Sequence, residues 1–95
     1  MGTVQVEFLA RLRTVAGSKT LSLTIGDNET ISTLLSRLVE RLGGEFQKAV
    51  FDEGGQIRRE VIIRHNGENI VVRRGLATDL RDGDVVTLMN AVAGG

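Results

Sequence analysis

The segment from Ile31 to Leu42 constrains the fold of this chain more than any other. Its apolar residues recur at helical spacing and are Ile31, Leu34, Leu35, Leu38, Val39 and Leu42. This spacing places them on a single stripe, which predicts an amphipathic helix. Thr30 stands where an N-cap is expected, and Gly43-Gly44 stands where the helix should stop. A helix with one apolar stripe must bury it against another layer, and the sequence around it predicts a sheet.

Two runs with strand periodicity precede this helix. Thr3 to Leu9 alternates, with three inward residues (Val4, Val6 and Phe8) and three outward residues (Gln5, Glu7 and Leu9). Lys19 to Ile25 alternates in the same way, with Leu21, Leu23 and Ile25 on one side. The intervening stretch from Ala10 to Ser18 breaks the alternation and contains Gly17, which indicates a loop. Two such runs so close in sequence predict an antiparallel pair.

The second half of the chain contains shorter elements. A short second helix is predicted over Glu45–Phe51, with Phe46, Ala49 and Val50 facing inward. The remaining predicted elements are a strand over Glu60–His65, a hairpin turn at Asn66-Gly67-Glu68, a short returning strand over Asn69–Val72, a tight turn at Arg81-Asp82-Gly83 and a last strand over Asp84–Asn90. In the last strand, Val86 and Leu88 share the inward face.

The order of these elements indicates a topology. The first and last predicted elements are both strands, and a right-handed crossover through the main helix would place them side by side and parallel. The sequence therefore predicts an α+β, ubiquitin-like β-grasp fold: a mixed sheet of four to five strands packed by one main helix plus a short second helix. We expect residues 1–90 to form this domain and residues 91–95 to form a flexible tail ending in Gly-Gly.

Composition excludes several functional classes. Twelve basic residues balance twelve acidic ones, and only three aromatic residues are present, so nucleic acid is not expected as a partner. No cysteine is present, which excludes a disulfide framework or a Cys-based metal site. No apolar run approaches the ~20 residues that span a bilayer, and the N-terminus does not resemble a signal peptide. We expect a cytoplasmic protein without a membrane partner.

The sequence ends in Gly94-Gly95, preceded by Val92 and Ala93. Glycine lacks a Cβ, so this segment can adopt φ values forbidden to other residues and can enter a channel too narrow for side chains. At a C-terminus, such a segment presents a free α-carboxylate. The alternative is a frayed end without function, as at many termini.

Several short motifs, in order, resemble those of a known family. They are Phe8-Leu9-Ala10-Arg11-Leu12-Arg13, Ala16-Gly17-Ser18, Thr30-Ile31-x-x-Leu34-Leu35, Asn66-Gly67, Leu80-x-Asp82-Gly83-Asp84-x-Val86 and Val92-Ala93-Gly94-Gly95. Together they resemble the MoaD and ThiS ubiquitin-like sulfur carriers. The similarity is closer to MoaD, the small subunit of molybdopterin synthase, and it covers essentially the whole chain.

The resemblance implies a chemistry for the tail. An E1-like adenylating enzyme of the MoeB or ThiF type would use Mg-ATP to convert the Gly95 carboxylate into an acyl-adenylate. A sulfur donor would then displace AMP and leave a C-terminal thiocarboxylate. A MoaE-type large subunit of molybdopterin synthase would take this sulfur for the molybdenum or tungsten cofactor. On this hypothesis the chain binds no cofactor and is a carrier rather than an enzyme, with Val92, Ala93 and Gly94 giving the tail its reach.

Two alternatives to this role stay open. A carrier for thiamine thiazole or tRNA thiolation, or a ubiquitin-like modifier joined to proteins through Gly95, would use the same activation. One departure from MoaD bears on this first alternative: many MoaD-like chains carry prolines before the final Val-x-Gly-Gly, whereas this chain has Asn90-Ala91 there. A non-covalent β-grasp interaction module, in which the Gly-Gly end is incidental, belongs to a different class.

The outward face of the central strands is the expected docking surface for partner enzymes, because it adjoins the point where the tail begins. Alternation places Leu9 and Met89 on this face, and we expect Ile70 to join them. The alternative for Met89 is that it fills an edge of the core. Two other signals carry no site: Asp82 and Asp84 flank Gly83 in a predicted turn, and His65 has no second His or Cys to share a metal with.

Overall fold

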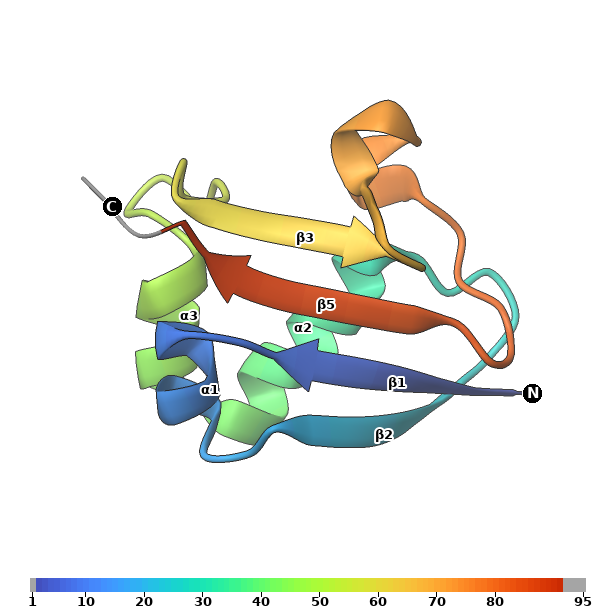
Figure 1. The fold of residues 1–95 in the computed structure, drawn as a ribbon, viewed down its shortest axis with the longest axis horizontal. Coiled ribbons are helices and arrows are strands. Elements are labelled where there is room, and N and C mark those ends of the chain that lie inside the picture. Colours follow the sequence, from blue (N-terminus) through green and yellow to red (C-terminus); the bar gives the residue numbers. More distant parts are fainter. Residues whose placement is uncertain (1, 92–95) are drawn as a thin grey trace.

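The computed structural model describes residues 2–91 and contains a five-stranded sheet with helices packed on one face (Figure 1). The strands are β1 (Gly2–Phe8), β2 (Thr20–Ile25), β3 (Val61–His65), β4 (Glu68–Asn69) and β5 (Val85–Asn90). The helices are α1 (Arg11–Ala16), α2 (Ile31–Leu42) and α3 (Gly44–Val50), with short 3₁₀ turns η1 (Ile70–Val72) and η2 (Gly75–Ala77). This arrangement confirms the predicted β-grasp fold.

The last strand lies in the centre of the sheet. The strand order is β2-β1-β5-β3-β4, with β5 parallel to β1 and antiparallel to β3. The turn before β5 packs on the start of β1: the Thr3 N–H donates to Asp82 Oδ1 at 2.9 Å, and the Gly83 N–H donates to the Thr3 carbonyl at 2.9 Å. A Cβ on Gly2 would lie 2.6 Å from the Cβ of Asp82, so this close approach requires glycine.

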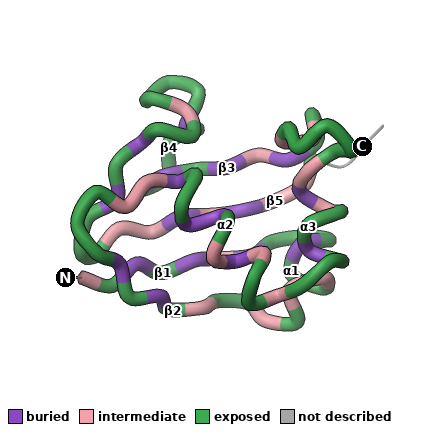
Figure 2. The backbone as a smooth tube through the Cα atoms, turned by 180° about the vertical axis from the view of Figure 1, so that it is seen from behind, coloured by how far each residue is buried: buried purple, intermediate pink, exposed green. Residues whose placement is uncertain are grey.

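The core lies between the sheet and α2. The inward residues predicted on the first and last strands (Val4, Val6, Phe8, Val86 and Leu88) are fully buried, as are Ile31, Leu34 and Leu38 of α2. In Figure 2, buried residues recur along the strands of the sheet and along α2. Thr30 caps α2 as predicted, since its side chain accepts a hydrogen bond from the Thr33 N–H and Thr33 reciprocates. Gly43 ends α2, and α3 begins at once, with Phe46 and Val50 buried.

The loop predicted between the first two strands is wrong, because α1 forms there. Leu12, Val15 and Ala16 have helical spacing, and Leu12 is fully buried. This signal is easily missed because the helix is six residues long and has no side-chain cap at its start. Ala10, with φ of 56°, turns the chain sharply out of β1, and Gly17 ends the helix in the left-handed conformation.

The returning strand predicted over residues 69–72 is also largely wrong. Pairing stops after Glu68–Asn69, and η1 follows. The Asn69 side chain accepts a hydrogen bond from the Val71 N–H at 3.0 Å, which favours a local turn over a strand ladder. Ile70 therefore turns into the core, with 7% exposure, while Val71 and Val72 point into solvent.

Candidate functional site

The site is built around the end of β5, from which the tail begins. The last residue of this strand, Asn90, pairs with Val61 on β3, and the next residue continues the ladder because the Ala91 N–H donates to the Glu60 carbonyl at 2.6 Å. The chain is thus held by sheet hydrogen bonds as far as Ala91, which is exposed. The predicted reacting residue Gly95 and the tail residues Val92, Ala93 and Gly94 lie outside the described residues.

The outer face of the sheet carries an apolar row beside this point. Met89 pairs with Ile62 across β5 and β3, and the parallel register of β1 and β5, continued by one residue, places Leu9 beside Met89. Leu9 is 43% exposed, and Met89 and Ile62 are half-buried. We call Leu9, Met89 and Ile62 the apolar row.

The next row of the same face is polar. The Thr87 hydroxyl donates to Glu7 Oε1 at 3.0 Å, and Arg64 lies opposite Thr87 on β3. The apolar character is therefore concentrated at the end of the sheet where the tail begins. A half-buried apolar edge with a polar rim is the pattern of a small protein-binding surface.

One predicted docking residue is misplaced, and one surface residue was missed. Ile70 belongs to the buried core and not to the outer face of the sheet, because η1 turns its side chain inward. Ile62 holds the third position of the apolar row instead. The signal for it was the alternation of β3, in which Val61, Ile63 and His65 face inward and leave Ile62 outward.

His65, which is buried, forms part of a partly exposed polar cluster at the other end of β5. Its Nε2 lies 2.7 Å from Asp84 Oδ2, and Asp84 also accepts hydrogen bonds from the Asn66 side chain and the Arg81 N–H. Burial would raise the pKa of the Asp84 carboxyl. The hydrogen bonds from His65, Asn66 and Arg81, together with the electrostatic interaction with His65, outweigh burial and lower that pKa below its ordinary value of 3.8.

This cluster predicts an acid-dependent contribution to stability. Because the folded-state pKa of Asp84 is depressed, its contribution is fully present above the unfolded-state pKa and is lost as pH falls through the folded-state pKa. We therefore expect Asp84→Asn to lower the free energy of unfolding at pH 6, and this difference from the wild type to shrink as pH falls below 3.8. Urea denaturation of both proteins between pH 6 and pH 2 measures this difference. Asp27→Asn, at an exposed position, is the control. A difference that stays constant with pH would contradict the assignment.

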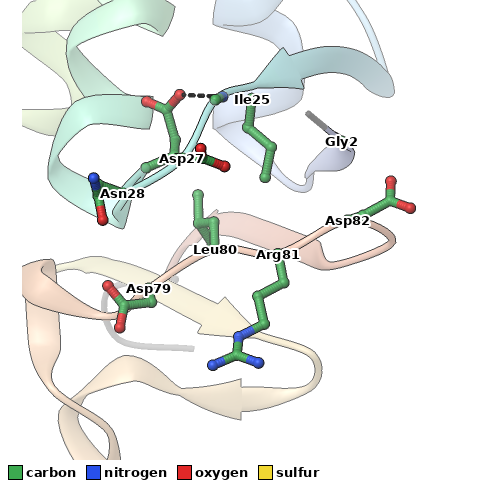
Figure 3. Close-up of a pocket in the computed structure, with 10 residues that line it drawn as sticks. Gly2, Ile25, Asp27, Asn28, Asp79, Leu80, Arg81 and Asp82 are labelled. Carbon is green, nitrogen blue, oxygen red and sulfur yellow. Dashed lines mark hydrogen bonds between the residues drawn. The ribbon is translucent and has the colours of Figure 1, made fainter.

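The acidic residues near the start of β1 form no metal site. A hollow of about 450 Å³ there is lined by Asp27, Glu29, Asp79 and Asp82, among others (Figure 3). Asp82 accepts from the Thr3 N–H, and Glu29 accepts from Arg37 and Thr33. Within residues 2–91, no group of three or more His, Asp or Glu side chains is placed to hold a metal ion. The predicted turn before β5 is present, and in it the Asp84 N–H donates to the Arg81 carbonyl at 3.1 Å.

A β-grasp sheet whose central last strand leads into a Gly-Gly segment defines the class of ubiquitin-like carrier and modifier proteins. The sequence matches the ThiS family over residues 6–95, and the chain belongs to that family.

In the described part of the chain, no helix has the length and apolarity needed to cross a membrane.

Two relatives align along nearly the whole chain. Small archaeal modifier protein 3 of Haloferax volcanii is 32% identical over 92 residues, which are 97% of this chain and 98% of the relative. Sulfur carrier protein CysO of Mycobacterium tuberculosis is 33% identical over 94 residues, which are 98% of this chain and 97% of the relative.

Solved structures agree with the fold. SAMP1 from Haloferax volcanii has a TM-score of 0.87 at 26% identity and covers 99% of this chain and 100% of its own. A putative molybdopterin converting factor subunit 1 from Pyrococcus furiosus has a TM-score of 0.77 at 26% identity, covering 97% and 100%. A structure of the BexX/CysO complex from Amycolatopsis orientalis matches with a TM-score of 0.76 at 29% identity, covering 97% and 99%. The family to which this chain belongs thus has relatives named as sulfur carrier and as modifier proteins, and one CysO structure contains the protein in complex with BexX.

Proposed function

We propose that this chain is a sulfur carrier that donates sulfur for molybdopterin synthesis as the small subunit of molybdopterin synthase. The observation that carries the proposal is the position of β5: a central strand, hydrogen-bonded on both sides, leads directly into Val92-Ala93-Gly94-Gly95. The match to the ThiS family extends through these residues. The likeness to the structure described as a molybdopterin converting factor subunit favours this pathway.

The chemistry begins at the Gly95 carboxylate, which is a poor electrophile because its negative charge repels nucleophiles. In the active site of an E1-like enzyme, one carboxylate oxygen attacks the α-phosphorus of ATP, and pyrophosphate leaves. Hydrosulfide from the sulfur donor then attacks the acyl carbon, a C–S bond forms as the C–O bond to AMP breaks, and the product is a thiocarboxylate. The tail contributes no charged side chain, so the Mg²⁺ and cationic groups that bring two anions together belong to the partner. The chain itself carries the sulfur and does not catalyse the transfer.

Incubation of the chain with an E1-like adenylating enzyme, Mg-ATP and a sulfur donor tests this chemistry. The expected result is an intact-mass shift equal to one oxygen replaced by sulfur. Adding the thiocarboxylated chain to a MoaE-type subunit and its pterin substrate should then yield the dithiolene product and return the chain to its original mass. No mass shift with an enzyme active on another carrier would favour a non-covalent interaction module.

A second candidate has its own support. The relatives named small archaeal modifier protein 3 and CysO, at 32% and 33% identity, are more similar in sequence than the 26% identical Pyrococcus furiosus protein. A carrier for another thiolation pathway, or a modifier joined through Gly95 to lysine side chains, is therefore the alternative. It predicts a thiocarboxylate that the MoaE-type subunit does not discharge, or an isopeptide bond to Gly95 that mass spectrometry of tryptic peptides would reveal.

The apolar row gives a prediction about docking. We expect Met89→Asp to raise the KM of the adenylating enzyme for the carrier by about tenfold or more, because an interface anchor would become a charge that must be desolvated. The fold should survive, since Met89 lies on the outer face. Steady-state adenylation kinetics measure the effect.

Val85→Asp is the matched control for this experiment. Val85 lies on the same strand and face but four residues further from the tail, beside Gln5. We expect Val85→Asp to leave the KM nearly unchanged. An equal KM increase in both variants would place the docking surface elsewhere, and an unfolded Met89→Asp variant would mean that Met89 belongs to the core.

A further inference from the structure

Three cationic side chains from separate parts of the chain meet at the base of the tail. Arg11 on α1, Lys48 on α3 and Arg58 in the segment before β3 line a hollow of about 240 Å³, together with Asn90 at the end of β5. We call Arg11, Lys48 and Arg58 the basic collar. Figure 1 shows α1, α3 and the end of β5 gathered at this end of the sheet.

Within the part of the chain that the structure describes, no ion pair involves the basic collar. The ion pairs found within residues 2–91 are Arg37–Glu29, His65–Asp84, Arg73–Glu68 and Arg74–Asp79. Glu60 also lines the hollow, so the charged side chains that line the hollow have a total formal charge of +2. The whole chain has no net charge, and the hollow is thus a local positive site on a neutral protein.

Hydrogen bonds of Arg58 hold one side of the hollow in place. The Arg58 Nε–H donates to the Lys48 carbonyl at 2.7 Å, and the Arg58 N–H donates to the Val50 carbonyl at 2.8 Å, so Arg58 ties α3 to the segment leading into β3.

We propose that the basic collar binds acidic side chains at the mouth of the channel through which the activating enzyme takes the tail. This inference rests on the proposed function and names the surface chemistry of the partner. The collar lines a hollow beside Asn90, the last residue of β5, so a channel that receives the tail would bring its mouth close to Arg11, Lys48 and Arg58. Complementary charge there would steer the tail toward its channel and set its orientation.

The length of the tail argues against a direct role for the collar in nucleotide binding. Gly95 lies four residues beyond Ala91 along the chain, and four residues span at most ~14 Å when extended. An extended tail therefore carries the Gly95 carboxylate, and the ATP phosphate it attacks, beyond the reach of the three cationic side chains. The group that meets the collar is the surface of the partner around the channel.

Charge reversal tests the proposal. In Arg11→Glu/Lys48→Glu, both altered side chains are exposed, and Arg58 is left in place because it holds the Lys48 carbonyl. With an E1-like adenylating enzyme and Mg-ATP, we expect the KM for the carrier to rise by about tenfold or more, with kcat within about twofold of the wild-type value. The wild-type KM should rise with salt from 50 to 300 mM, and this dependence should be weaker in the double variant because the attraction has been removed.

A matched control separates local recognition from a general field effect. Arg74→Glu/Arg81→Glu makes the same change in charge at exposed positions away from the tail, and we expect its KM and salt dependence to stay close to those of the wild type. The neutral variant Arg11→Gln/Lys48→Gln, checked by circular dichroism, should give an intermediate KM. If charge reversal prevents folding, this neutral variant still tests the proposal.

Three results would overturn the inference while leaving the carrier function intact. They are an unchanged KM in the collar variants, an equal KM increase in the control pair, and calorimetric binding of pyrophosphate to the isolated wild-type chain that the collar variants lose. The last result would make the hollow a site for small anions. If the enzyme adenylates another carrier but not the wild-type chain, the proposed function and this inference both fail.

Discussion

Adding one alanine after Gly95 is expected to abolish conversion of the chain to its thiocarboxylate. On the proposed function, the reacting carboxylate must reach the α-phosphate of ATP at the end of a channel, with the reacting atoms ~3–3.5 Å apart. One extra residue moves the carboxylate by up to ~3.6 Å and places a Cβ in the narrowest part of the channel. A misplacement of ~1 Å can already cost on the order of a hundredfold in rate, so no conversion should be detectable.

Intact-mass measurement after incubation with the adenylating enzyme, Mg-ATP and a sulfur donor tests this expectation. Deletion of Gly95 should give the same loss. The control carries the extra alanine at the N-terminus, where it leaves the tail unchanged, and it should convert like the wild type. Equal conversion of the C-terminally extended chain would contradict the role of Gly95 and favour the non-covalent interaction module.

The second large effect is expected in the core. Phe8 is fully buried at the end of β1, and its ring meets that of Phe46 on α3 edge to face, with centroids 6.1 Å apart and planes at 88°. Phe8→Ala removes this contact and leaves a cavity, which should lower the free energy of unfolding by ~3–5 kcal/mol. Since domains of this size are stable by ~5–15 kcal/mol, the variant should be partly unfolded or close to it at 37 °C.

The neighbouring residue provides the control for this substitution. Leu9→Ala changes the next side chain along, which is 43% exposed, and it should cost less than ~1 kcal/mol. Urea denaturation of the two variants and the wild type gives the comparison. If both variants lost a similar amount of unfolding free energy, Leu9 would be as buried as Phe8. Leu9 would then not lie on the outer face, and the apolar row would lose its support.

Local sequence patterns predicted the elements whose burial follows a regular period. The helical stripe that begins at Ile31 and the strand alternation of Val4, Val6 and Phe8 are each repeated several times over, so neighbouring residues reinforce the same assignment. The six residues of α1 and the break after Asn69 offered no such repetition. A short helix without a side-chain cap and a turn closed by one asparagine are decided by one or two contacts rather than by a period.

The residues of the candidate site also differ in whether local sequence patterns could place them. The Gly-Gly segment and the outward positions of Leu9 and Met89 could be read from the sequence, because each depends on residue type or on alternation within one strand. The alternation of β3 indicates only that Ile62 faces outward, and its place beside Met89 in the apolar row depends on the pairing of β3 with β5. Ile70 was misassigned because a single turn at Asn69 reverses the direction of its side chain.

By itself the sequence determined the class of fold, the main helix and the Gly-Gly end on which the proposed chemistry depends. These features follow from short-range periodicity and from the absence of side chains on two glycines. Only the tertiary structure brought Arg11, Lys48 and Arg58 together at the base of the tail and joined His65 to Asp84. Their separation along the chain leaves no periodic signal, and their meeting depends on how α1, α3 and the central strands pack, a consequence of the whole core.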